Sequence, residues 1–166
     1  FNTNDHHFRE SLFLNDGKGF FTDVTATHVP ANQSWTDYHV IADFDGDSDL
    51  DVVLLTPFTS DPNLLLRNDG RGRFTQASPK VFPAVRGRSG MAVDVDGDRD
   101  MDLVLFPDFA CSAVRAVLLN DGRGIFTEKA FRGLSPSPAG PVLVGDFNGD
   151  GLPDFYFNGA SKLLFN

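Results

Sequence analysis

Residues 43–51 read Asp-Phe-Asp-Gly-Asp-Ser-Asp-Leu-Asp, and the same pattern returns at residues 94–102 and 146–154. Each copy has the form Asp-x-(Asp/Asn)-Gly-Asp-x-x-x-Asp, and successive copies begin 51 and 52 residues apart. A fixed period of this size is typical of repeat architectures, in which each unit is one supersecondary structure. The chain is therefore predicted to be an array of three units of about 52 residues.

A second motif recurs in step with the first. Asn-Asp-Gly begins at residues 15, 68 and 120, and each copy continues as x-Gly-x-Phe-Thr. Asn-Asp-Gly between apolar stretches indicates a β-hairpin, because Asn and Gly both tolerate positive φ. Each unit is therefore expected to contain one hairpin turn of this kind as well as one Asp-rich turn.

Short apolar runs flank both motifs, and no segment shows a sustained helical period. The predicted strands are at residues 11–15, 21–25, 40–42, 52–55, 64–67, 91–93, 103–106, 117–119, 142–144 and 155–157. Short, evenly spaced strands in four-stranded units predict an all-β fold of β-propeller-type blades. We expect one repeat domain over residues 1–166, with units at about 9–62, 63–114 and 115–166.

The phase of the repeat predicts that both terminal blades are split. If a blade begins at the strand before the Asp-rich turn, the chain starts with the last two strands of one blade and continues with two complete blades. Residues 163–166, Leu-Leu-Phe-Asn, match residues 12–15, Leu-Phe-Leu-Asn, so the last blade lacks its outer strand. Propellers close with 4–8 blades. We therefore expect completion by a longer chain, or by a homo-oligomer joined through the terminal strands.

The Asp-rich turns are predicted metal sites. Four or five carboxylates within nine residues repel one another, and a folded loop holds them together around a cation. Oxygen ligands in this number favour calcium over zinc, and they suit the looser geometry of calcium better than the rigid octahedron of magnesium. By analogy with other such loops, the ligands are the side chains at positions 1, 3, 5 and 9 and the backbone carbonyl at position 7. The expected ligands of the three calcium ions are Asp43, Asp45, Asp47, Asp49 and Asp51; Asp94, Asp96, Asp98, Asp100 and Asp102; and Asp146, Asn148, Asp150, Leu152 and Asp154.

Two alternatives, an EF-hand and a simple acidic turn, fit this sequence less well than a nine-residue calcium-binding loop. An EF-hand needs Glu at position 12, where this chain has Leu54, Leu105 and Phe157. An acidic, solvated turn is an ordinary use of Asp and Gly, but turn propensity alone does not fix an Asp at position 9 in three copies.

Charge and hydropathy exclude two classes of protein. The chain has 14 basic and 23 acidic residues and a net charge of −9, whereas a nucleic-acid-binding protein needs a positive field. No stretch approaches the roughly 20 apolar residues of a membrane span. Thirteen of the acidic residues lie in the three Asp-rich turns, so three calcium ions would bring the net charge to −3.

These motifs resemble the FG-GAP and VCBS type repeats of integrin-like β-propellers and of many secreted bacterial proteins. Residues 43–51 and the three Asn-Asp-Gly-x-Gly-x-Phe-Thr segments carry the resemblance, which covers most of the chain. It implies four-stranded blades, calcium between the first two strands of a blade, and an extracellular setting. It also implies that the ions are largely structural and that ligands bind elsewhere. The Phe-Gly and Gly-Ala-Pro pieces that name the repeat are not evident here.

The segment before the first Asp-rich turn is a candidate ligand loop. An exposed Trp35 and Tyr38 could stack on a sugar or anchor a protein partner. Packing of Trp35 between blades is the alternative. The same segment contains the sequon Asn32-Gln33-Ser34, so Asn32 is a possible glycosylation site and the loop could instead be a modified surface.

The sequence therefore predicts a secreted, calcium-binding, non-enzymatic β-propeller-repeat protein that acts in self-assembly or adhesion at the cell surface. No Ser-His-Asp set with supporting local sequence is present. The first alternative is a carbohydrate- or protein-binding propeller, such as a lectin or adhesion head, that uses the loop around Trp35. The second is a non-catalytic propeller fragment of a larger extracellular enzyme.

Overall fold

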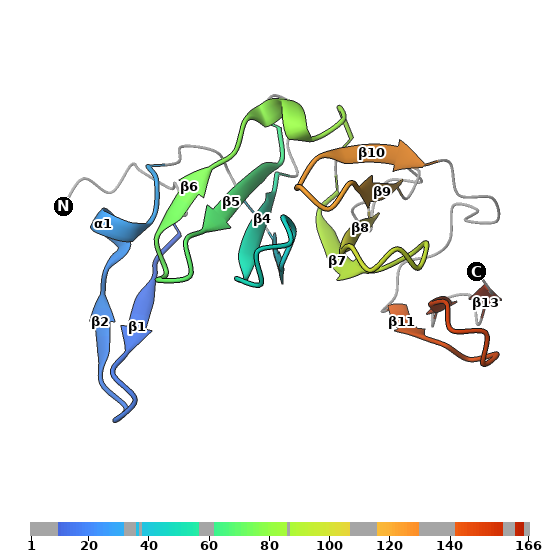
Figure 1. Ribbon diagram of the computed structural model, residues 1–166, viewed down its shortest axis with the longest axis horizontal. Coiled ribbons are helices and arrows are strands. Elements are labelled where there is room, and N and C mark those ends of the chain that lie inside the picture. The colour runs from blue at the N-terminus through green and yellow to red at the C-terminus, as the bar shows by residue number, and fades with distance from the viewer. Residues whose placement is uncertain are drawn as a thin grey trace.

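The computed structural model describes residues 10–31, 36, 38–56, 62–85, 87–106, 116–129, 142–157 and 162–164. Within these residues the chain is almost entirely β, with one four-residue α-helix and one short 3-10 helix. Thirteen strands form four separate sheets, and every strand pairing is antiparallel. Figure 1 shows the sheets following one another from the N-terminal end to the C-terminal end of the molecule.

The strands divide among the sheets as two, four, four and three. We call the sheets the N-terminal hairpin, the second sheet, the third sheet and the C-terminal sheet. Their strands are, in that order, β1 (Phe13–Asn15) and β2 (Phe21–Asp23); β3 (Tyr38–Ala42), β4 (Asp51–Leu55), β5 (Leu64–Asn68) and β6 (Phe74–Gln76); β7 (Ser89–Val93), β8 (Asp102–Phe106), β9 (Ala116–Asn120) and β10 (Phe126–Lys129); and β11 (Val142–Gly145), β12 (Asp154–Phe157) and β13 (Lys162–Leu164). The predicted all-β fold of propeller-like blades, with split terminal blades, is confirmed.

Two predicted strands are too long. The strand expected at residues 11–15 begins only at Phe13. The strand expected at residues 21–25 ends at Asp23, and α1 (Thr25–His28) follows it. The Asp23 carboxylate accepts the amide proton of Thr25, which turns the chain out of the extended conformation. The Thr25 hydroxyl in turn accepts the amide proton of Leu12, so this helical turn stays attached to the hairpin.

The Asn-Asp-Gly turns are held by their own side chains. In the turn between β5 and β6, the Asp69 carboxylate accepts the amide protons of Arg71 and Arg73, and the Asn68 side chain accepts that of Gly72. Gly70 and Gly72 have φ near +75°, a conformation that costs Gly little. The N-terminal hairpin and the β9–β10 turn repeat this pattern. The motif therefore fixes one specific turn in each unit.

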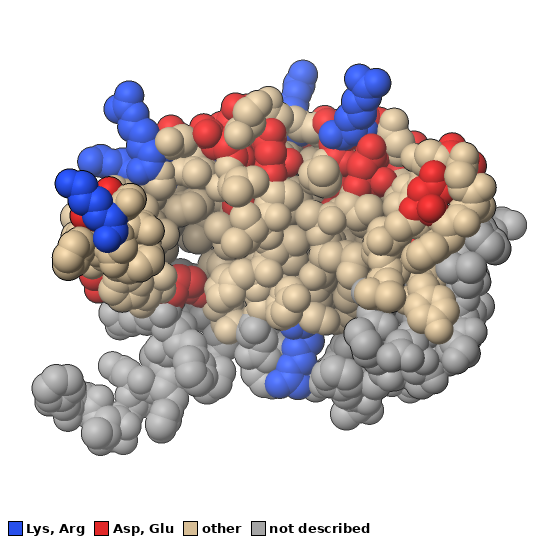
Figure 2. Space-filling model, turned by 90° about the horizontal axis from the view of Figure 1, so that it is seen from below, with Lys and Arg blue, Asp and Glu red and all other residues tan. Residues whose placement is uncertain are grey.

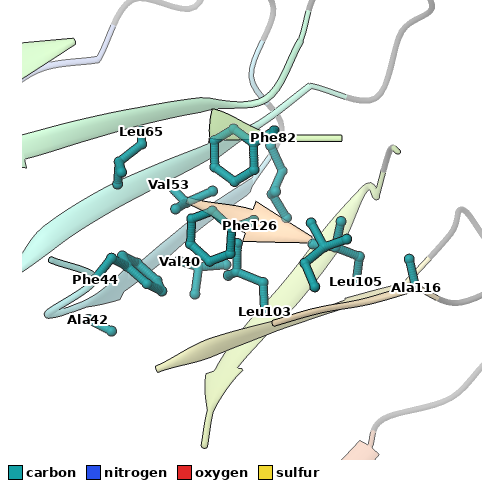
Figure 3. Packing of buried hydrophobic residues seen from close by; sticks show 12 residues of the cluster. Val40, Ala42, Phe44, Val53, Leu65, Phe82, Leu103, Leu105, Ala116 and Phe126 are labelled. Atoms are coloured by element: carbon teal, nitrogen blue, oxygen red, sulfur yellow. The ribbon is translucent and has the colours of Figure 1, made fainter. Parts of the chain in front are cut away.

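Apolar clusters lie between consecutive sheets. The largest joins the second and third sheets, where Phe126 of β10 stacks on Phe82 with 4.8 Å between ring centroids and meets Phe44 edge-on at 5.7 Å (Figure 3). Phe82 directly follows η1 (Pro79–Val81). A second cluster, built around Val95 and Phe155, joins the third and C-terminal sheets. Burial of these side chains between sheets is the main force that holds the array together.

No helix in the described part of the chain has both the length and the apolar character that a membrane crossing requires.

Candidate metal centre

The aspartate at position 9 of each Asp-rich turn forms the base of the turn. Asp51, Asp102 and Asp154 are the first residues of β4, β8 and β12, and all three are 0% exposed. Each accepts the amide proton of the residue at position 2, at 2.8–3.1 Å. Asp51 and Asp102 also accept the amide protons of Asn68 and Asn120, which begin the Asn-Asp-Gly turns of the same sheets. In these two sheets, the contact ties the Asp-rich turn to the Asn-Asp-Gly turn.

The aspartate at position 1 shapes the turn from the other side. Asp43 accepts the amide protons of Gly46 at 2.8 Å and Ser48 at 2.9 Å, and Asp94 and Asp146 bind their own turns in the same way. Position 4 is always Gly, with φ between +79° and +81°. Position 6 also has positive φ, including +73° at Ser48 and +80° at Arg99. The backbone therefore holds the turn in a strained, well-defined conformation.

The carboxylates at position 7 of the first two turns lie against the glycines of the Asn-Asp-Gly turns. A Cβ atom on Gly70 would meet Asp49 Oδ2 at 2.5 Å, and one on Gly122 would meet Asp100 Oδ2 at the same distance. A side chain at either glycine would displace this carboxylate from its position. The positive φ of +74° at Gly70 and +73° at Gly122 is the stronger reason for glycine at these positions.

Carboxylates converge in the first and second turns. One oxygen each from Asp43, Asp45 and Asp51 lies within 4.8 Å of the others, and Asp94, Asp96 and Asp102 form the same group in the second turn. In the first group, Asp45 Oδ1 is buried and accepts no hydrogen bond from the described residues. An unpartnered buried oxygen on one of three converging carboxylates is what a hard cation would satisfy. Each of these two groups could hold a metal ion.

The electrostatics of these groups favour a bound cation. Burial raises the pKa of Asp102 to about 6, and the nearby charges of Asp96 and Asp98 push it the same way. Burial also raises the pKa of Asp51 and of Asp45. Figure 2 shows that acidic side chains gather in separate patches along one edge of the molecule. Without a counter-ion, these carboxylates cost the folded protein free energy whenever they are ionised.

These pKa values predict a pH dependence of the metal-free protein. Between the ordinary aspartate pKa of 3.8 and about 6, folded Asp102 retains a proton that the unfolded chain has released. The free energy of unfolding therefore falls as the pH rises through this window. We expect a melting temperature several degrees lower at pH 7 than at pH 4.5 in metal-free buffer, and saturating calcium should remove this loss. A melting temperature that is higher at pH 7 than at pH 4.5 without metal would contradict a raised pKa of Asp102 in the folded protein.

The third turn has a weaker set of charges. Position 3 is Asn148, whose amide donates to Asp150 at 2.8 Å, and Asp146 at position 1 is exposed. Backbone amides of Gly151 and Gly149 lower the pKa of Asp146, so it is readily ionised. Only Asp154 is buried in this turn. Positions 1, 3 and 9 thus supply two carboxylates and one amide, in place of three carboxylates.

The first turn also contacts the next sheet. The Asn120 amide, which is buried at the end of β9, donates to the carbonyls of Phe44 in the first turn and of Met101 in its own sheet. Its oxygen accepts the amide proton of Gly124. Among the described residues, the side chain of the equivalent Asn68 bonds to Leu50 and Gly72, both within its own sheet.

Replacement of Asn120 tests the value of this contact. Asn120→Ala removes the donor to the buried Phe44 carbonyl and the part-buried Met101 carbonyl and the acceptor of the buried Gly124 amide, so we expect it to lower the free energy of unfolding by about 2–4 kcal/mol. The matched control Asn68→Ala, at the half-buried equivalent position, should cost about half as much or less. Urea unfolding followed by circular dichroism measures both. Equal losses would show that the contact between sheets contributes nothing.

The candidate ligand loop lies only partly within the described residues. Tyr38 begins β3 with a side chain that is 45% exposed, whereas Asn32 and Trp35 lie outside the described residues. Two features of the site were not predicted: the bonds of the Asn68 and Asn120 side chains, and an ion pair between Arg67 Nε and Asp45 Oδ2 at 3.5 Å. An alignment of the repeats contains a signal for the ion pair. Arg67 directly precedes Asn-Asp-Gly in its unit, whereas the other copies have Leu14 and Leu119 at that position.

Comparison with known families agrees with this architecture. The FG-GAP-like repeat matches residues 3–54, 43–105 and 94–157, and each match contains at least one Asp-rich turn. FG-GAP-like repeats build propeller-like domains and are typical of extracellular and cell-surface proteins. A comparison with curated proteins found no significant match. The repeat matches span nearly the whole sequence, and the chain belongs to the FG-GAP-like repeat family.

Proposed function

We propose that this chain is a calcium-binding, non-enzymatic module of an extracellular protein, in which each Asp-rich turn holds one calcium ion between the first two strands of its sheet. The observation that carries the proposal is the convergence of three carboxylates in each of the first two turns. FG-GAP repeats often bind calcium, which adds independent support. The bound ions would offset part of the negative charge of the turns and cross-link their two ends.

The role of the ions is structural in this proposal. The carboxylates at the base of the first two turns, Asp51 and Asp102, each already accept two backbone amide protons. Both carboxylates therefore hold the turn through backbone contacts, which favours a structural role for them. The ion supplies positive charge where a strand, the Asp-rich turn and the Asn-Asp-Gly turn meet. Because this arrangement exists only in the folded chain, the free energy of ion binding adds to the free energy of unfolding.

The third turn tests the ligand assignment by gain of function. Asn148→Asp gives it the same three carboxylates as the first two turns. Ligand charge is one determinant of calcium affinity, so we expect the calcium affinity of this turn to rise about tenfold. A calcium titration that follows the Gly149 amide by NMR would measure the change. Unchanged affinity would contradict the assignment of position 3 as a ligand.

Exposed apolar side chains on the two terminal sheets favour self-assembly as the role of this calcium-binding module. Phe13, Phe20 and Phe21 of the N-terminal hairpin are 53–74% exposed, and Leu143 and Phe147 of the C-terminal sheet are 59% and 53% exposed. Apolar side chains exposed in groups mark surfaces of association. A second copy is the partner we propose for them, joined through the terminal strands. Adhesion to a glycan or an extracellular protein through the loop of Trp35 and Tyr38 is the alternative.

Light scattering with calcium and with chelator tests this role. Self-assembly predicts a calcium-dependent oligomer, and removal of residues 163–166 should abolish it while calcium binding survives. Monomers of both forms would contradict self-assembly. The adhesion alternative predicts instead that replacing Trp35 and Tyr38 by Ala removes glycan or partner binding without a change in stability.

A further inference from the structure

Arg67 places a positive charge beside the first Asp-rich turn. It is the fourth residue of β5 (Leu64–Asn68) and directly precedes the Asn-Asp-Gly turn. The same position is occupied by Leu14, Leu119 and Phe165 in the other copies. The cation is therefore a property of this one unit and not of the repeat in general.

The Arg67 guanidinium connects a carboxylate of the turn to the next sheet. Its Nε lies 3.5 Å from Asp45 Oδ2, and its Nη2 donates to the backbone carbonyl of Arg123, in the β9–β10 turn. Gly124 makes room for this approach, because a Cβ atom there would lie 3.2 Å from Arg67 Nη2. The Arg67 side chain is 36% exposed and Asp45 is 16% exposed, so solvent screens the pair only in part.

Asp45 has a positive partner on one side and an unpartnered oxygen on the other. Its Oδ2 faces Arg67, its buried Oδ1 has no hydrogen-bond partner among the described residues, and one of its oxygens belongs to the converging group of Asp43, Asp45 and Asp51. In the metal-free protein, Arg67 supplies part of the positive charge that this group needs. A calcium ion that enters the group must bind against that charge.

We propose that Arg67 acts as a built-in counter-ion of the first Asp-rich turn, which stabilises the metal-free turn and lowers its affinity for calcium. The inference rests on the proposed function, since it assigns a regulator to the same calcium site. Arg67 could instead raise affinity by orienting Asp45. The separation of 3.5 Å is too long for a strong hydrogen bond, so orientation is weakly enforced. Repulsion between the Arg67 charge and a divalent ion does not depend on such alignment. We therefore expect this repulsion to outweigh the orienting effect of Arg67 on Asp45.

The test is a calcium titration followed by amide resonances that report each turn separately. Gly46 and Gly97 occupy position 4 of the first and second turns, and each donates its amide proton to the position 1 carboxylate at 2.8 Å. Removal of one unit charge beside a divalent ion should change affinity about tenfold. In Arg67→Leu, which copies Leu119, we expect the Gly46 midpoint to fall to about one tenth of the wild-type calcium concentration. The Gly97 midpoint should not move.

Three further variants separate charge from packing. Arg67→Gln removes the charge but keeps a polar side chain, so it should lower the Gly46 midpoint as Arg67→Leu does. Arg67→Lys keeps the charge and should stay close to wild type. Arg71→Leu removes an exposed positive charge from the β5–β6 turn and should leave both midpoints unchanged. The metal-free melting temperature should fall in the Leu and Gln variants of Arg67, opposite in sign to their gain in affinity.

Two results would overturn the inference and are distinguishable. If the Gly46 midpoint is unchanged or higher in both neutral variants while Gly97 still titrates, Arg67 does not weaken the site and the calcium proposal stands. If neither glycine responds to calcium in any variant, the calcium proposal fails and the inference fails with it.

Discussion

Saturating calcium is expected to raise the melting temperature of this chain by about 10–20 °C over the chelated protein. An ion at one hundred times its dissociation constant adds about 2.7 kcal/mol to the free energy of unfolding. The first two turns, each with three converging carboxylates, should therefore contribute about 5 kcal/mol together. For a chain of this size, each kcal/mol corresponds to roughly 2–4 °C. Thermal unfolding followed by circular dichroism, with calcium and with chelator, measures the shift.

A pair of matched variants ties this stabilisation to the turns. Asp96→Asn removes an exposed carboxylate of the converging group in the second turn and copies the natural Asn148 of the third, so it should reduce the calcium-induced shift by up to half. Asp16→Asn removes an exposed carboxylate from an Asn-Asp-Gly turn and should leave the shift unchanged. An equal melting temperature with and without calcium in the wild type would contradict a structural role for the ions.

Truncation of Phe44 is expected to have the second large effect. Phe44 is 0% exposed at position 2 of the first turn, where it meets Phe126 of the next sheet edge-on. Phe44→Ala removes this packing and leaves a cavity between the second and third sheets. The expected loss is about 3–5 kcal/mol in the free energy of unfolding, which urea unfolding would measure.

Phe147→Ala is the natural control for this substitution. Phe147 occupies the same position in the third turn but is 53% exposed, because no further sheet packs against it within the described residues. Its truncation should change the free energy of unfolding of the monomer by about 0.5 kcal/mol or less. A loss at Phe147 as large as that at Phe44 would contradict the assignment of Phe44's contribution to the contact between sheets.

Sequence alone predicts the parts of this fold that depend on local chemistry. The Asp-rich turns, the Asn-Asp-Gly turns and the apolar runs between them determine where strands begin and end, which is why the division into split and complete sheets was predicted correctly. The helical turn at Thr25 was missed because the alternation of residues 21–25 continues past Asp23. There the Thr25 amide donates a hydrogen bond to the Asp23 carboxylate, and the chain leaves the strand conformation.

Contacts between sheets could not be predicted, because they depend on how one unit packs against the next. Nothing local to Asn120 distinguishes it from Asn68, yet only Asn120 is bonded to the preceding sheet at Phe44. Likewise, Arg67 pairs with Asp45 of the first Asp-rich turn and with the Arg123 carbonyl of the β9–β10 turn. These contacts form only because the second and third sheets pack together. An alignment of the repeats points to Arg67 as unusual but does not supply its partners.

Isothermal titration calorimetry of calcium into the chelator-stripped chain decides whether the Asp-rich turns are metal sites. We predict two ions per chain bound in the first and second turns, with dissociation constants below about 1 mM, and a third bound more weakly. Asp96→Asn should weaken or remove one of the two stronger sites. The absence of any binding at millimolar calcium would contradict the assignment of these turns as calcium sites.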